Sequence, residues 1–193
     1  MAEALHHEST GIDNRKLAMW AFLSSEFLLF GALIANYLLF KGEQHQGVTP
    51  PLLYDIPFTS ISSFVLLMSS LTMVLAHNAW ENEDQSGART WLLATASLGM
   101  VFISGQVFEF TEFVGEGMKV STNPLASSFY VLTGFHGAHV TVGIVMLLSL
   151  FMISRRMGGL RHDRGMNVEL VGLYWHFVDI IWIVIFTVVY LIP

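Results

Sequence analysis

The sequence predicts an all-α integral membrane protein: a single bundle of five transmembrane helices, with its N-terminus in the cytoplasm and its C-terminus outside. Of the 193 residues, 53% are hydrophobic and only 12% are charged, whereas a soluble domain carries about 25% charged residues. The charged residues are clustered, which leaves five long apolar runs between them. A helix needs about 20 apolar residues to cross a hydrocarbon core about 30 Å thick, and these runs meet that requirement.

The apolar runs cover residues 17–40, 58–76, 90–113, 125–153 and 168–192, and none of them contains Lys or Arg. Each is expected to be a helix, because backbone polar groups in lipid must be satisfied within their own segment. The first run is not a signal peptide, since a polar tail precedes it, Glu26 interrupts it and it is too long for a signal core. We therefore expect a cytoplasmic tail over residues 1–16 and one membrane domain over residues 17–193.

The run at 58–76 is the least apolar, because seven hydroxyl residues lie in it or at its edge: Thr59, Ser60, Ser62, Ser63, Ser69, Ser70 and Thr72. Small and hydroxyl side chains permit close packing between membrane helices. We therefore expect a helix that faces the bundle, and the alternative is a re-entrant segment.

Lys and Arg set the expected orientation, because they are enriched in cytoplasmic segments. With the N-terminus inside, the inner segments hold seven of them: Arg15, Lys16, Arg89, Arg155, Arg156, Arg161 and Arg164. The outer segments hold only Lys41 and Lys119. This asymmetry favours a cytoplasmic N-terminus.

Composition excludes several classes of protein. There is no Cys, which excludes a disulfide scaffold, a thiolate metal site and an iron–sulfur cluster. No basic cluster with interleaved aromatic residues suggests a nucleic-acid partner. The linkers between the apolar runs are too short to hold a soluble domain.

Seven ionisable side chains lie deep in the apolar runs, where each is a functional hypothesis because burying it is costly. They are Glu26, Glu109, Glu112, His136, His139, His176 and Asp179. All except Glu26 form pairs three residues apart, and residues at that spacing share a helix face. The last three helices should therefore each carry a polar stripe, and these stripes should turn inward and meet.

The paired residues admit three interpretations. In the first, they hydrogen-bond across helices and fix the register of the bundle. In the second they bind metal, as Glu and His do in di-iron bundles, but those sites usually carry Glu-x-x-His on one helix, and here the acids and the imidazoles lie on different helices. In the third, two histidines ligate a haem, with Gly134 and Gly137 beside His136 allowing close approach. The spacing favours the first interpretation and leaves the others open.

Glu26 differs from the pairs. It lies about 10 residues into its run, which is roughly 14 Å at 1.5 Å per residue, and its own helix offers no basic partner. A carboxyl near the bilayer midplane is expected to keep its proton. It is either a proton-exchanging, reactive acid or a neutral acid hydrogen-bonded to a neighbour or a lipid.

Four motifs resemble, in the same order along the chain, subunit III of cytochrome c oxidase and of related quinol oxidases. They are Ser25-Glu26 with the apolar residues 27–30 after it; Gln106 with Glu109 and Glu112; Gly134-Phe135-His136-Gly137-Ala138-His139-Val140; and Tyr174-Trp175-His176-Phe177-Val178-Asp179 with Trp182. Ala76-His77 also fits. The family commonly has seven helices, and this chain looks like the five-helix form of several bacterial oxidases. It would begin at the third helix, so another subunit is expected to supply the wall that the first two helices give to a lipid-filled cleft.

The resemblance implies a subunit without a catalytic residue, haem, copper or other metal of its own. It implies contact with subunit I, which with its neighbours carries the haem and copper, and an assembly that includes subunit II and in some complexes a small subunit IV. That complex would lie in a bacterial inner (plasma) membrane and couple oxygen reduction to water with proton pumping. The subunit would sustain proton uptake into subunit I, protect it from inactivation during turnover, and bind structural phospholipid.

The resemblance also implies residue roles. Glu26 matches the carbodiimide-reactive glutamate of the family, a proton- and lipid-linked acid. Glu109, Glu112, His136, His139, His176 and Asp179 match residues that bond the helices together. Arg155 and Arg156 are expected to bind lipid headgroups, since each cation near the inner surface contributes about 1 kcal/mol. The alternative function is a membrane metalloenzyme that uses the inward Glu and His residues.

Overall fold

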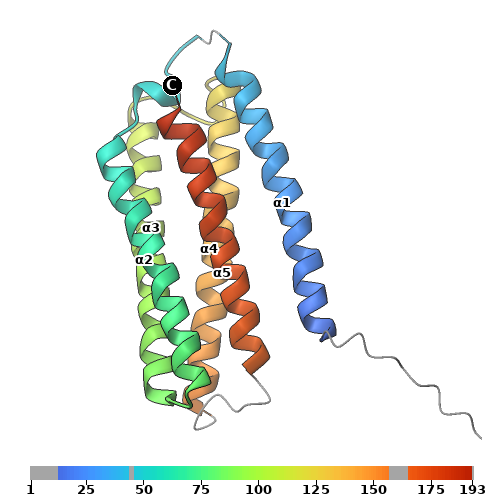
Figure 1. The fold of residues 1–193 in the computed structure, drawn as a ribbon. Coiled ribbons are helices and arrows are strands. Elements are labelled where there is room, and N and C mark those ends of the chain that lie inside the picture. Colours follow the sequence, from blue (N-terminus) through green and yellow to red (C-terminus); the bar gives the residue numbers. More distant parts are fainter. Residues whose placement is uncertain (1–12, 44–45, 157–164, 193) are drawn as a thin grey trace, which may run out of the picture.

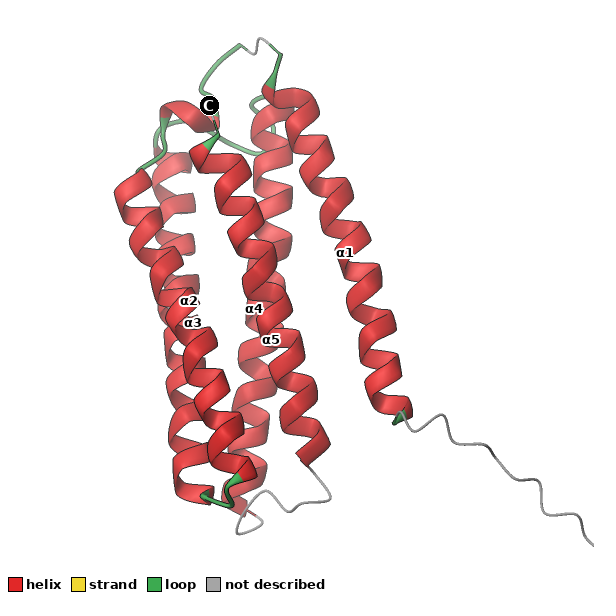
Figure 2. Cartoon of the chain, in the orientation of Figure 1, coloured by secondary structure: helices red, strands yellow, loops and turns green. Residues whose placement is uncertain are grey.

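The computed structural model describes residues 13–43, 46–156 and 165–192. This part of the chain is helical and contains no strand (Figure 2). The long helices are α1 (Asn14–Lys41), α2 (Ile56–Glu81), α3 (Gln85–Gly115), α4 (Pro124–Arg156) and α5 (Gly165–Phe186), which continues into a π-helical turn, η3 (Thr187–Leu191). A short 3-10 turn, η1 (Pro50–Leu52), precedes α2. Five helices in the described residues are long and apolar enough to cross a membrane, which confirms the predicted fold class.

The helices extend beyond the apolar runs because aspartates cap three of their N-termini. Asp13 accepts a hydrogen bond from the Arg15 amide at 2.8 Å, and Asp55 accepts one from the Phe58 amide at 3.1 Å. Asp84 accepts one from the amide of Gly87 at 2.9 Å. A carboxylate at this position satisfies a free backbone donor and complements the positive end of the helix dipole.

Helices α2, α3, α4 and α5 form a ring in which each packs against two neighbours, and α1 lies outside the ring against α4 and α5 (Figure 1). In α1 the buried residues are Leu23, Phe30 and Tyr37, spaced seven apart. That spacing is typical of a single narrow seam between two helices. Most of the remaining surface of α1 is exposed in this chain.

The ring closes around the indole of Trp175. A Cβ atom built on Gly99 of α3 would lie 2.6 Å from this ring, and one built on Gly143 of α4 would lie 2.7 Å from it. The indole Nε1 donates to the Ser69 hydroxyl of α2 at 3.0 Å. Two glycines and one serine therefore make room for the largest fully buried side chain.

Helix α2 turns its hydroxyl residues towards the ring, as expected. Thr59, Ser63, Ser69 and Thr72 are buried, and the Ser63 hydroxyl accepts a hydrogen bond from Trp182 of α5 at 2.9 Å. Because α2 is one continuous helix of 26 residues, this segment is not re-entrant.

The up-and-down order of the helices places Lys16, Arg89 and Arg155 at one end of the bundle, here called the basic end, and Lys41 and Lys119 at the other (Figure 1). Arg161 and Arg164 lie outside the described residues. The grouping agrees with the charge asymmetry from which a cytoplasmic N-terminus was inferred. Which end faces the cytoplasm remains a prediction.

Two lysines join α1 to the ends of α5. At the basic end Lys16 pairs with Glu169. At the opposite end the Lys41 ammonium donates to the Val188 carbonyl at 3.1 Å and to the Ile192 carbonyl. A cation at the C-terminus of a helix satisfies free carbonyl groups and complements the helix dipole.

Lys41→Met should therefore loosen η3, with a loss of about 1 kcal/mol for the half-exposed charged hydrogen bonds. Amide hydrogen exchange should rise at residues 187–192. The exposed Lys119 supplies the control: Lys119→Met removes the same charge from the same end of the bundle and should leave that exchange unchanged. Equal exchange in both variants would contradict the capping role.

Candidate functional site: polar clusters inside the bundle

Glu26 meets a basic partner on another helix. The His139 Nε2 of α4 lies 3.0 Å from the Glu26 Oε2, and the two side chains are only 15% and 16% exposed. The His139 Nδ1 lies 2.7 Å from the Phe135 carbonyl oxygen, and the ring of Phe30 packs edge-on against the imidazole at 5.1 Å. The acid without a partner on its own helix is therefore paired across the α1–α4 seam.

The contact with Phe135 determines how many hydrogen atoms the His139 imidazole and the Glu26 carboxyl carry between them. A carbonyl oxygen can only accept, so the His139 Nδ1 must carry a hydrogen. The Nε2 and the Glu26 carboxyl then share one proton: either the neutral acid donates to a neutral imidazole, or an imidazolium donates to a carboxylate. In both states the pair has no net charge, which allows it to lie in the bilayer.

Glu109 is the centre of a second cluster, at the end of the bundle opposite the basic end. Its Oε1 accepts from the Thr59 hydroxyl of α2 at 3.1 Å and from the Tyr190 hydroxyl of η3 at 3.2 Å. The ring of Tyr54 lies 4.4 Å from that of Tyr190, and the Tyr54 and Tyr37 hydroxyls lie 3.0 Å apart. The cluster thus joins α1, α2, α3 and η3.

Tyr54 lies outside the helices, in the loop before α2. Burial raises its pKa, and the neighbouring Tyr37 raises it further, so this phenol stays neutral at physiological pH. The π-helical turn shifts the register of the last residues of α5, a feature frequent at functional sites. Within that turn Tyr190 is buried and reaches Glu109. Glu112, three residues after Glu109, is exposed.

His136 lies among aromatic rings instead of polar groups. It is fully buried, its ring stacks on Trp182 at 4.8 Å, and Phe102 packs edge-on against it at 5.8 Å. Among the described residues neither ring nitrogen has a hydrogen-bond partner. The imidazole therefore fills space in the core between α3, α4 and α5.

His176 and Asp179 of α5 converge on one hydroxyl of α2. The His176 Nδ1 lies 2.6 Å from the Ser70 Oγ, and the Asp179 carboxyl is in hydrogen-bonding contact with the same serine. Asp179 is only 5% exposed, and its Oδ1 has no partner among the described residues.

The polar stripes are thus satisfied differently from the expectation that they would meet one another. The acids and imidazoles mostly contact serine, threonine and tyrosine hydroxyls of neighbouring helices, and Glu26 with His139 is an ionisable pair between helices α1 and α4. In the part of the chain that the structure describes, no three His, Asp or Glu side chains are placed to hold one metal ion. The geometry therefore joins helices and does not present a ligand set.

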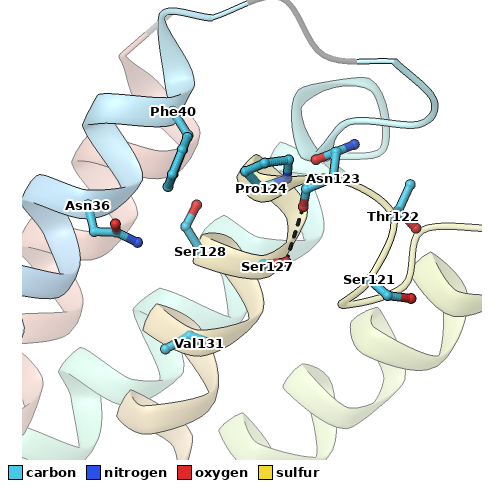
Figure 3. Close-up of a pocket in the computed structure, with 9 residues that line it drawn as sticks. All are labelled: Asn36, Phe40, Ser121, Thr122, Asn123, Pro124, Ser127, Ser128 and Val131. Carbon is cyan, nitrogen blue, oxygen red and sulfur yellow. Dashed lines mark hydrogen bonds between the residues drawn. The ribbon is translucent and has the colours of Figure 1, made fainter.

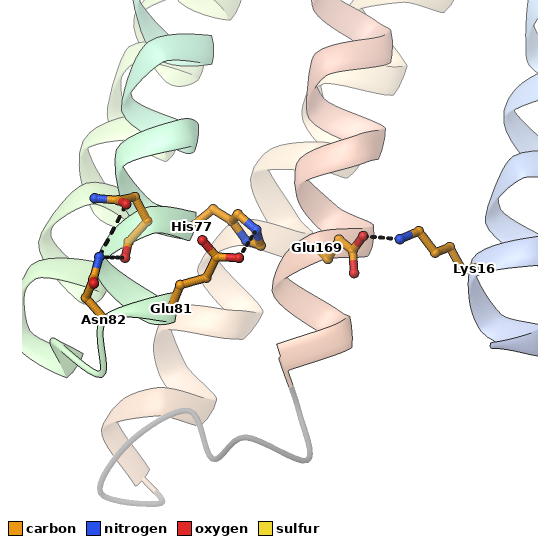
Figure 4. A network of polar contacts seen from close by, with 6 residues as sticks. Lys16, His77, Glu81, Asn82 and Glu169 are labelled. Carbon is orange, nitrogen blue, oxygen red and sulfur yellow. Dashed lines mark hydrogen bonds and ion pairs between the residues drawn. The ribbon is translucent and has the colours of Figure 1, made fainter. Parts of the chain in front are cut away.

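Several polar contacts were not anticipated from the sequence. Arg89 of α3 donates twice to Ser154 of α4, from Nε to the hydroxyl and from Nη2 to the carbonyl, both at 2.8 Å. At the same end His77 and Glu81 of α2 lie 3.4 Å apart (Figure 4). The contact of His77 with Glu81 could have been predicted from the sequence, because residues four apart are neighbours on a helix surface. The pairing of Arg89 with Ser154 had no signal, because it depends on how α3 and α4 align.

The two arginines assigned to lipid lie at the C-terminus of α4. Arg155 and Arg156 are exposed, and the Arg155 guanidinium lies 5.9 Å from the centre of the Phe151 ring. At the other end a surface pocket of about 580 Å³ opens between α1 and the start of α4 (Figure 3). Asn36, Phe40, Ser127, Ser128 and Val131 line it, together with residues 121–124.

Comparison with known proteins identifies the family. The family described as "Cytochrome c oxidase subunit III" matches residues 3–192. The chain is 39% identical over 196 residues to the "Probable quinol oxidase subunit 3" of Staphylococcus saprophyticus subsp. saprophyticus, covering 97% of each chain. It is 38% identical over 191 residues to the "Cytochrome c oxidase subunit 3" of Thermostichus vulcanus, covering 99% of this chain and 94% of that one. A "Cytochrome c oxidase subunit 3" of Bacillus sp. (strain PS3) is 39% identical over 178 residues, which is 92% of this chain and 86% of the relative. The chain therefore belongs to the cytochrome c oxidase subunit III family, whose members are subunits of haem-copper oxidase complexes of aerobic respiration.

Proposed function

We propose that this chain is a non-catalytic subunit of a proton-pumping oxygen reductase in a bacterial plasma membrane. It packs against subunit I, in a complex with subunit II and in some cases a small subunit IV, and the haem and copper belong to those partners. Its role is to stabilise subunit I, to sustain proton uptake into it and to bind structural phospholipid. The full-length match to subunit III proteins supports this assignment.

The observation that carries the proton-linked part is the pairing of Glu26 with His139. The pair lies in the bilayer, has no net charge and contains one proton that either partner can hold. Such a pair can take up or release a proton when its surroundings change. Glu109, His139, His176 and Asp179 hold helices together in this proposal, and His136 does so by packing alone. The exposed Glu112 is not part of that set, and Arg155 and Arg156 bind lipid phosphates at the membrane surface.

Glu26→Gln tests this role. The Gln amide can still donate to the His139 Nε2, so the oxidase complex should assemble and begin turnover at the normal rate, but the shared proton is gone. Proton uptake per electron should fall, and activity should decay sooner during sustained turnover. The measurements are proton release by reconstituted complex and the lifetime of oxygen consumption.

The matched control is Glu112→Gln, which makes the same chemical change at an exposed acid. If both variants pump and decay like the wild type, the proton-linked role of Glu26 is wrong. Failure of the Glu26→Gln complex to assemble would show that the acid is structural.

Purification in mild detergent tests the assignment to a complex. Subunits I and II should accompany the chain, together with a haem absorption spectrum. A chain that works alone, or that binds stoichiometric iron in isolation, would favour the metalloenzyme instead.

A further inference from the structure

A small crevice opens between α2 and α5 at the basic end of the bundle. It has a volume of about 180 Å³ and is lined by Met73, Val74, His77, Val168, Glu169, Gly172, Leu173 and His176. Figure 4 shows His77 beside Glu81 on α2, and Glu169 on α5 facing Lys16 of α1. The polar groups around the crevice thus come from three helices, in two contacts: the ion pair of Lys16 with Glu169, and the contact of the His77 imidazole with the Glu81 carboxylate.

The crevice can hold water. Each water occupies about 30 Å³ and needs two to four polar partners, and three lining residues offer them. The His77 Nδ1 is buried without a partner among the described residues, and Glu169 presents a partly exposed carboxylate. Since the His176 Nδ1 is bonded to Ser70, its Nε2 is the nitrogen available to the crevice.

Beyond His176, hydrogen bonds continue inward to a buried acid. The Ser70 hydroxyl lies 2.6 Å from the His176 Nδ1 and is also in contact with the Asp179 carboxyl. Asp179 is 5% exposed, and one of its oxygens has no partner among the described residues. A buried acid thus lies next to the Ser70–His176 contact, which leads from the two histidines and the glutamate in the mainly apolar lining of the crevice.

We propose that this crevice is hydrated and conducts protons between the aqueous phase at the basic end and Asp179, by way of His176 and Ser70. The ligand that this crevice delivers to the Asp179 carboxyl is a proton. The proposal does not depend on the role given to Glu26, and it would hold whatever the partner subunits are.

The transfer balances with one proton and no other reactant. A water in the crevice protonates the His176 Nε2, while the Nδ1 hydrogen passes to the Ser70 Oγ and the Ser70 hydrogen passes to the Asp179 carboxylate. Asp179 becomes neutral, His176 returns to a neutral imidazole with its hydrogen on Nε2, and the water becomes hydroxide that the bulk neutralises. The reverse sequence releases the proton.

Infrared spectroscopy of the intact, purified complex tests the proposal. The carbonyl stretch of protonated Asp179 is identified as the band lost in Asp179→Asn, and its shift is followed after transfer from H₂O to D₂O. In the wild type this band should depend on pH and should exchange readily. In Ser70→Ala, exchange should slow by about tenfold or more, because a positioned proton-transfer group typically contributes a factor of 10²–10⁴.

Three variants separate the relay from general damage to the fold. Ser70→Thr keeps the hydroxyl and should restore the rate. His77→Phe, at the partly exposed mouth, should slow exchange while leaving Ser70 in place. Ser97→Ala removes a hydroxyl from the exposed face of α3, where it donates to the Leu93 carbonyl of its own helix, and should have no effect. The Glu109 band at the far end of the bundle serves as the internal reference and should exchange equally in all of them.

Three results would overturn the proposal. If no carboxylic acid band of Asp179 appears at any pH, the residue is permanently ionised and carries no exchangeable proton. If Ser70→Ala and His77→Phe exchange as fast as Ser97→Ala, protons reach Asp179 by another route. If the Asp179 and Glu109 bands slow together, the change reflects the whole bundle and not the crevice.

Discussion

Gly143→Ala should destabilise the bundle by about 1–3 kcal/mol, the usual cost of forcing extra atoms into a packed core. Its Cβ would lie 2.7 Å from Cε3 and 2.8 Å from Cζ3 of the Trp175 ring. The indole must then move, and its hydrogen bond to Ser69 lengthens or breaks. The measurement is the free energy of unfolding of the purified protein in mixed detergent micelles.

Gly31→Ala is the matched control. Among the described residues, nothing outside the adjacent backbone of α1 lies within 4 Å of a Cβ built on Gly31, so the same substitution should be neutral or should stabilise the helix by up to about 1 kcal/mol. Trp175→Ala should cost about 3–5 kcal/mol, because it leaves a cavity. If Gly143→Ala and Gly31→Ala unfold alike, the packing of Trp175 between Gly99 and Gly143 is not the constraint described above.

Glu109→Leu should have the second large effect, about 1–3 kcal/mol for each buried hydroxyl left without a partner. The Tyr190 hydroxyl would lose its acceptor, whereas Thr59 could still donate to the Asp55 carbonyl, from which it lies 3.0 Å. Glu109→Gln keeps an acceptor oxygen and should cost less. The free energy of unfolding measures both.

Tyr190→Phe provides the second arm of a double-mutant cycle with Glu109→Leu. Because the two residues share a contact, the double variant should cost less than the sum of the single variants. The exposed Glu112 is the control, and Glu112→Leu should be close to neutral. Additive costs would show that the hydrogen bond between Tyr190 and Glu109 contributes little.

The sequence predicted the number, type and order of the helices, because each follows from a long apolar run. It placed the helix ends less well. The apolar run at 58–76 becomes α2 from Ile56 to Glu81, since Asp55 caps the start and polar residues remain helical beyond the apolar stretch. The apolar run at 168–192 includes a change to a π-helical turn at Thr187, and hydropathy does not predict this change.

Spacing predicted which polar residues share a helix face but not what they would touch. Glu109 and Glu112 are three residues apart, yet Glu109 is buried and Glu112 is exposed. The rotation of α3 about its axis places the boundary between its buried and exposed faces between these two residues. Similarly, His136 points into the aromatic core while His139 points to α1. Partners such as Ser70 and Tyr190 depend on how the helices align, which composition and periodicity do not determine.

The narrow seam of α1 also makes this helix sensitive to insertions and deletions. Leu23, Phe30 and Tyr37 recur every seven residues and form the buried side of α1. The contacts of Glu26, Lys16 and Lys41 with the other helices also depend on the rotation of α1 about its axis. One residue inserted after Phe30 would rotate everything beyond it by about 100°, turning Tyr37 and Lys41 towards lipid while leaving Lys16 and Glu26 in place. Deletions or insertions within α1 should therefore be far more harmful than single substitutions on its exposed side.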